Sequence, residues 1–198
     1  MAEIVVDGVG TVERPGDRAE VDAHLSVVAP TREDAVRALG RRVGGLDDPA
    51  VASAIRRRAV GVHENYADGK VMNGFRATEF VELRVDDPAD LDAVIAALTA
   101  AGPSWMNGPR WSLQDESAAR REAQVLAVAD ARERAAAYAD ALGVRLGELV
   151  RLTDASASWG PDSRAVGLSM GPSEVGALRL DPDPVTVTAR CTLSWTVG

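Results

Sequence analysis

Alternating apolar and polar positions along the chain predict three strands, each with one buried face. The clearest is at the C-terminus, where every second residue from Val185 to Val197 is apolar and the residues between them are polar. The same alternation runs through residues 18–29 and through part of residues 75–85. A period of two indicates strands with one face packed and one face in water. Such strands suit an antiparallel or mixed sheet covered by helices on one face.

Cap residues and apolar positions three or four apart predict three helices between these strands. Thr31 is a suitable N-cap for a helix that Gly44-Gly45 interrupts, and Asp48-Pro49 can begin a short second piece. Asp87-Pro88 opens the next helix. The longest helix is predicted from about Asp115 to Leu142, with Gly143 as a left-handed terminator. Its buried stripe is predicted to be Val125, Val128, Ala135, Tyr138 and Leu142.

The order of these elements predicts the fold class and the domain organisation. Residues 18–39 and residues 76–98 each contain a predicted strand, then a proline, then a helix with the sequence Asp-Ala-Val. Duplication of a strand–helix unit and chance similarity explain this likeness equally well. Residues 154–184 are rich in Gly, Pro, Ser and Asp and predict a long loop before the closing strand. We therefore predict a single α+β domain over residues 1–198. Its sheet is mixed and mostly antiparallel, with helices packed on one face and repeated strand–helix units.

Composition narrows the classes of function. The chain has 198 residues, of which 46% are hydrophobic and 26% charged, as is ordinary for a soluble domain. Its net charge of -8 argues against nucleic-acid binding, which needs many Lys and Arg contacts to phosphate. No apolar run is long enough to insert into a membrane. The first residues do not resemble a secretory signal, so the expected location is cytoplasmic.

One motif raises the question of a serine hydrolase. Residues 167–171 match the G-x-S-x-G pattern around Ser169. A working nucleophile elbow lies between a buried strand and a helix, and its histidine follows the serine in the chain. Here Pro172 follows at once, and the two histidines, His24 and His63, both precede Ser169. Ser169 is therefore predicted to be unreactive, and both histidines are predicted to be side chains on strand surfaces.

Two further motifs resemble cofactor and metal sites without completing them. Gly8-Val9-Gly10 is half of a dinucleotide fingerprint, but Glu13 occupies the third glycine position. Glycines in a strand more often mark a close approach of another backbone. The segment from His63 to Tyr66 begins like a zinc-protease helix, but its second histidine is missing. No cofactor and no metal ion are therefore predicted.

The remaining candidate residues have structural interpretations. Asp47-Asp48 and Asp86-Asp87 each precede a proline at a predicted helix start, where acids complement the helix dipole. Arg56-Arg57-Arg58 is interpreted as a solvated helix end, with contact to a protein partner as the alternative. Cys191 is the single cysteine, which excludes an intramolecular disulfide. It lies on the buried face of the closing strand and is predicted to be an inert thiol.

Several segments resemble the SIMPL-domain family. The most specific is the Ala/Arg-rich stretch at residues 118–152, which is similar to the family's signature helix. Residues 8–35, 64–95 and 185–197 resemble the opening, middle and closing segments of the family. The resemblance implies a structural role for Gly8-Val9-Gly10. Members of this family are bacterial proteins that are mostly exported and tend to self-associate. They are often linked to oxidative-stress defence or described as immunogenic surface proteins. The resemblance implies these properties for the chain, and it supplies no established catalytic residues.

These observations lead to one expected function and one rival. We expect a non-enzymatic oligomeric scaffold or interaction module, linked to envelope or oxidative-stress physiology, that forms homo-oligomers and can contact a protein partner. The rival is a small-ligand-binding protein or an enzyme whose site lies in the loop at residues 154–184. No catalytic, cofactor-binding or metal-binding residue is predicted.

Overall fold

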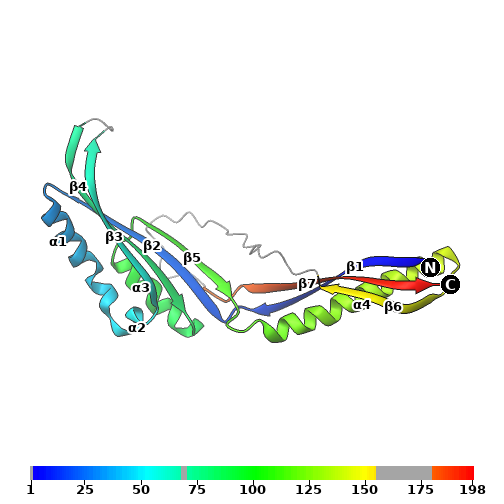
Figure 1. The fold of residues 1–198 in the computed structure, drawn as a ribbon. Helices are drawn as coiled ribbons and strands as arrows, with labels where there is room; N and C mark the ends of the chain where they lie inside the picture. Colours follow the sequence, from blue (N-terminus) through cyan, green and yellow to red (C-terminus); the bar gives the residue numbers. More distant parts are fainter. Residues whose placement is uncertain (1, 68–70, 155–179) are drawn as a thin grey trace. The chain divides into compact units, whose positions relative to one another are not determined.

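The computed structural model describes residues 2–67, 71–154 and 180–198, which form an α+β fold as predicted (Figure 1). The described residues belong to two compact units. Unit 1 contains residues 2–15, 113–154 and 184–198, and the remainder forms unit 2. Each unit has its own antiparallel sheet in place of the one sheet predicted. Alternation along a strand reveals its buried face but not its neighbours, so the sequence pattern could not separate the two sheets.

Unit 1 is a three-stranded sheet covered by one long helix. The strands β1 (Glu3–Pro15), β7 (Pro184–Val197) and β6 (Leu146–Asp154) lie in the order β1-β7-β6. Helix α4 (Ser117–Leu142) packs on β1 and β7 and touches β6 only slightly. The predicted alternation of the closing strand is confirmed. The buried apolar residues of β7 are Val187, Ala189, Cys191, Leu193 and Trp195.

The buried stripe of α4 differs from the predicted one. It consists of alanines spaced four residues apart: Ala119, Ala123, Ala127, Ala131, Ala135 and Ala139. The larger residues predicted to be buried, Val125, Val128, Tyr138 and Leu142, are all exposed. Only Ala135 was assigned correctly. The prediction was wrong because it ranked apolar residues by size, whereas the space between helix and sheet admits only methyl groups.

Two glycines in β1 explain that narrow space. A Cβ atom on Gly8 would lie 2.0 Å from the carbonyl oxygen of Ala127. A Cβ atom on Gly10 would lie 2.0 Å from the carbonyl oxygen of Ala123. The helix backbone therefore rests directly on β1. This confirms that Gly8-Val9-Gly10 belongs to a strand and permits the close approach of another backbone.

Unit 2 is a four-stranded antiparallel sheet in the order β3-β4-β2-β5, with helices over one face. The two predicted strand–helix units are present in it, and their strands are adjacent. Its elements are β2 (Arg18–Ala29), α1 (Arg32–Val43), η1 (Gly44–Asp47), α2 (Pro49–Ala52), β3 (Ile55–Ala67), β4 (Val71–Val85), η2 (Pro88–Asp90), α3 (Leu91–Ala100) and β5 (Trp105–Ser112).

The predicted helix ends are confirmed by their hydrogen bonds and backbone angles. The Thr31 hydroxyl accepts a hydrogen bond from the Asp34 main-chain N–H at 3.1 Å, as a capping residue should. Helix α1 ends before Gly44, and α2 begins at Pro49. The Asp87 side chain caps η2, and Gly143 ends α4 with φ 68°.

Candidate functional site

Two of the predicted sites lie outside the described residues. Ser169 and its G-x-S-x-G motif fall within residues 155–179, as does most of the loop assigned to the rival function. The histidines are described. His24 lies half-buried on β2, and His63 lies exposed on β3. Both are therefore side chains on strands, as predicted.

A serine–histidine contact joins the residue before β5 to β2 and was not predicted. The Nδ1 atom of His24 lies 3.0 Å from the Oγ atom of Ser104. Ser104 donates its hydroxyl proton to the main-chain oxygen of His24 at 2.8 Å. A nucleophilic serine instead directs that proton to a histidine whose other ring nitrogen is held by an acid. The Ser104 hydroxyl proton is instead directed to a main-chain oxygen, and the separation of 80 residues left no sequence signal for the contact.

The arginine triplet has a different position from the one predicted. Arg56, Arg57 and Arg58 lie in β3, not at a helix end. Each forms an ion pair within unit 2, with Asp86, Glu82 and Glu79 respectively. The helix-end part of the interpretation was wrong because the triplet lies in a strand, while all three arginines are exposed as expected of a solvated segment.

The paired aspartates have two different roles, helix capping and ion pairing. Asp87 caps a helix as predicted, whereas Asp47 pairs with Arg58. Asp86 pairs with Arg18 at 2.8 Å and also with Arg56 and Arg84. The hydrogen bond from Arg18, with the charges of the other arginines, holds the pKa of Asp86 below its ordinary value. Asp47, Asp86 and Asp87 thus all make contacts within unit 2.

The described residues were compared with the requirements of a metal site and of a membrane-spanning helix. Within residues 2–67, 71–154 and 180–198, no three His, Cys, Asp or Glu side chains are grouped so that they could hold a metal ion. No helix in those residues is long and apolar enough to cross a membrane. Cys191 is buried on β7, as predicted.

The Cys191 thiol is expected to resist thiol reagents in the native protein. Burial between α4 and the sheet raises the pKa of this thiol, which disfavours the reactive thiolate. If labelling requires an opening that costs about 3 kcal/mol, it slows by about a hundredfold. Labelling with a chromogenic disulfide should therefore be slow in buffer and should reach one thiol per chain in denaturant. Equal rates in the two conditions would contradict the burial of Cys191.

The surface with the most exposed large apolar side chains in unit 1 lies on α4 and β6. Val125 and Val128 on α4 are 68% and 40% exposed, and Leu149 and Leu152 on β6 are 53% and 54% exposed. Leu149 lies opposite Trp195, and Leu152 lies opposite Leu193. Because directly opposed residues share a face of the sheet, both leucines are on the face that α4 covers over β7. We call Val125, Val128, Leu149 and Leu152 the α4–β6 surface.

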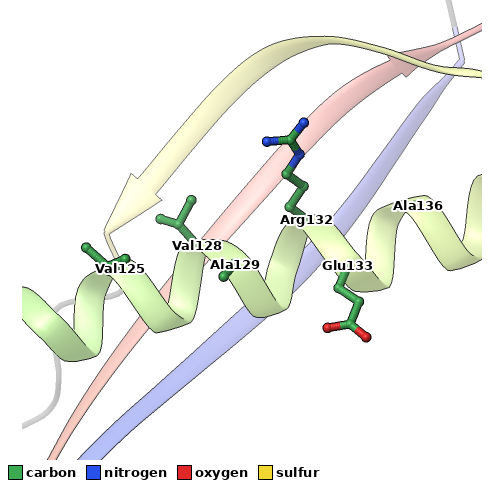
Figure 2. Close-up of a pocket in the computed structure, with 6 residues that line it drawn as sticks. All are labelled: Val125, Val128, Ala129, Arg132, Glu133 and Ala136. Atoms are coloured by element: carbon green, nitrogen blue, oxygen red, sulfur yellow. The ribbon is translucent and has the colours of Figure 1, made fainter.

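The sheet register places the end of β6 at the level of the middle of α4. Gly8 lies against Ala131 of α4 and opposite Cys191 of β7. Cys191 in turn lies opposite Asp154, the last residue of β6. The end of β6 therefore reaches the middle of α4. Figure 2 shows this strand end near Val125 and Val128, with Arg132 projecting on the same side.

The opposite flank of α4 is closed by polar contacts to the edge of β1. Asp130 accepts a hydrogen bond from the Val9 main-chain N–H at 2.9 Å. Arg134 donates to the Asp7 carbonyl oxygen at 2.6 Å. These bonds satisfy main-chain groups that an edge strand otherwise offers to another chain. The two flanks of α4 thus differ. On the β1 side, charged side chains of α4 bind main-chain groups of β1, whereas on the β6 side, apolar side chains are exposed.

Comparison with known protein families matches one family model to residues 4–195 of the chain. The chain belongs to the SIMPL family. This confirms the resemblance noted in the sequence, and the match includes segments of both units. The SIMPL family is described as a protein of unknown function (DUF541), so membership assigns no activity. No curated protein matches the chain. The most specific SIMPL-like segment, residues 118–152, contains all four residues of the α4–β6 surface.

Proposed function

We propose that this SIMPL protein is a non-enzymatic scaffold that assembles with further copies of itself through the α4–β6 surface. The observation that carries the proposal is the exposure of four large apolar side chains, two on α4 and two on β6, while polar contacts cover the flank of α4 beside β1. Single exposed apolar residues are ordinary, but a group of them marks an interaction surface. The family resemblance extends the proposal to a role in envelope or oxidative-stress physiology.

The size of the surface indicates how strong such an assembly is. Burying the exposed half of a large apolar side chain contributes about 1 kcal/mol. Four side chains from each of two copies then contribute on the order of 8 kcal/mol. Association costs about 4–15 kcal/mol in lost freedom of motion. The apolar contact offsets this cost without exceeding it by much, so the assembly is expected to depend on protein concentration.

Net charge opposes the assembly in a way that can be tested. Each copy carries a net charge of -8, so two copies repel each other. Salt screens this repulsion over a Debye length of about 8 Å at physiological ionic strength. Added salt is therefore expected to strengthen self-association through the α4–β6 surface. Salt would instead weaken a contact that was held together by salt bridges.

Substitution of Val125 by glutamate is expected to lower the average mass of the protein toward the single-chain mass of 20.8 kDa. The change places a charge on the α4–β6 surface, where burial would remove it from water. Val5→Glu is the matched control, because Val5 is 61% exposed against 68% for Val125 and belongs to the same unit. Both variants add one negative charge, but Val5 lies on the sheet face away from α4.

Light scattering coupled to size-exclusion chromatography measures the result. The proposal requires that Val125→Glu reduce the average mass while Val5→Glu leaves it near that of the unmodified chain. Equal masses for the two variants would remove the α4–β6 surface as the site of assembly. Far-ultraviolet circular dichroism of each variant verifies that α4 remains folded.

A further inference from the structure

Strand β3 forms one edge of the unit 2 sheet, and part of it is regular. It pairs with β4 on one side, and no described strand pairs with its other side. The β3–β4 register is interrupted between Ile55 and Arg57 and again between Glu64 and Tyr66. Between these points, residues 57–64 pair without interruption. Within this stretch the four residues from Ala59 to Val62 carry neither charge nor proline, the features that usually protect an edge strand.

The faces of this stretch follow from its partners on β4. Arg58, Val60 and Val62 lie opposite Val81, Glu79 and Ala77, which are buried on the helix-covered face. Glu64 lies opposite Phe75, which packs against the same core. The helices cover β2 and β4 more than β3, and Val60 is 64% exposed. The edge therefore presents Arg, Val, Val and Glu in alternate positions along one face.

We propose that β3 pairs antiparallel with β3 of a second copy, about a two-fold axis at Gly61. This pairing places Arg58 opposite Glu64 of the second copy, and Val60 opposite Val62 of the second copy. Each contact occurs twice because of the symmetry. Oppositely charged and β-branched pairs directly across two strands both stabilise a sheet. The edge is thus complementary to itself in charge and in shape.

Other registers lose this complementarity. Centring the pair on Val60 places Arg58 opposite Val62, and centring it on Val62 places Val60 opposite Glu64. A slip by one residue would bring opposite faces together. Arg58 uses Nε and Nη1 for Glu79 and Asp47, so within the described residues its Nη2 group is available to Glu64 of the second copy. Only the Gly61 centre pairs charge with charge and valine with valine.

The inference rests on the proposed self-association and adds a second contact to it, in the other unit. The partner is again a copy of this chain, because the pattern is complementary to itself. The contact joins two four-stranded sheets into one continuous sheet through main-chain hydrogen bonds. Each chain then has two contacts with other copies, the α4–β6 surface in unit 1 and the β3 edge in unit 2. Assembly can therefore extend beyond a pair of copies.

Disulfide trapping tests the register. Directly opposed residues have Cβ atoms about 4.5–5.5 Å apart, close to what a disulfide needs, whereas diagonal neighbours lie about 7–8 Å apart. Val60→Cys and Val62→Cys are prepared as separate variants of the 198-residue chain. On mild oxidation, their mixture is expected to give at least about ten times more covalent dimer than either variant alone. The native thiol, Cys191, is buried and serves as the background in the unmodified chain.

Glu64→Arg, added to both cysteine variants, provides a second readout. It places like charges opposite each other across the proposed pair and is expected to lower the dimer yield severalfold. Glu64 is exposed, so the substitution leaves the core intact. An unchanged yield would contradict the register.

The outcomes separate the two proposals. If the mixture gives no covalent dimer while Val125→Glu still reduces the mass, the β3 pairing is wrong and the α4–β6 surface stands. If the mixture gives dimer while Val125→Glu has no effect, the β3 pairing stands and the α4–β6 surface is wrong. Equal dimer yields from each variant alone and from the mixture would overturn the proposed register.

Discussion

Replacing Gly10 by alanine is expected to destabilise unit 1 by about 3 kcal/mol, at the upper end of what an overpacked core costs. The added Cβ atom would lie 2.0 Å from the Ala123 carbonyl oxygen and 2.5 Å from the Ala127 nitrogen. Both are main-chain atoms, so no side-chain rotation relieves the contact. Helix α4 must move away from β1, which loosens the packing of its alanine stripe.

Gly40→Ala is the matched control for this substitution. Gly40 lies in α1, and a Cβ atom there would meet no other atom within 4 Å. Alanine in a helix is more favourable than glycine by about 1 kcal/mol, so this variant is expected to be slightly more stable than the parent. Urea unfolding followed by circular dichroism measures both. Equal stabilities for Gly10→Ala and the parent would show that α4 does not rest on β1 as described.

Replacing Arg58 by methionine is expected to destabilise unit 2 by about 3–5 kcal/mol. The side chain of Glu79 is 3% exposed, and that of Arg58 is 36% exposed. Glu79 lies opposite Leu25 on the buried face of the sheet. Without Arg58, its carboxylate stays in the core with no compensating charge, which costs more than the pair contributes when intact.

The double variant Arg58→Met with Glu79→Leu separates this explanation from loss of packing. Removing both charges leaves no uncompensated group, so its stability is expected to lie much closer to the parent's. Asp47→Ala removes only the exposed partner of Arg58 and should cost less than about 1 kcal/mol. A double variant as unstable as Arg58→Met would contradict the role assigned to the buried carboxylate.

Local patterns predicted most of the elements correctly. The alternation in residues 185–197 identified a strand with one buried face, because side chains in a strand point to opposite faces in turn. Thr31 and Gly143 marked helix ends because their side chain or backbone satisfies groups that a helix leaves unpaired. These features depend on neighbours in the sequence and need no knowledge of the fold.

Features that depend on distant partners were missed. Residues 105–112 and 146–154 form strands without a clear alternation, and their pairing with β2 and β7 determines them. Arg56 to Arg58 lie in a strand that pairs with β4, where acids from β4 and nearby segments bind them. The alanine stripe of α4 did carry a signal, an unbroken spacing of four from Ala119 to Ala139. Its meaning depends on Gly8 and Gly10, more than a hundred residues away in the chain.

The candidate site could not be predicted for the same reason. Val125 and Val128 were expected in the core, since large apolar residues on a helix usually face it. Their exposure becomes visible only when the helix is placed on the sheet through its alanines. Two of the residues wrongly predicted to be buried, Val125 and Val128, form the helix part of the α4–β6 surface.

Sedimentation velocity of the unmodified 198-residue chain tests the central claim most directly. If the chain assembles through its apolar surface, the weight-average mass rises above 20.8 kDa with protein concentration and rises further with added salt. The mass of one chain, 20.8 kDa, at every concentration and salt level would contradict the claim.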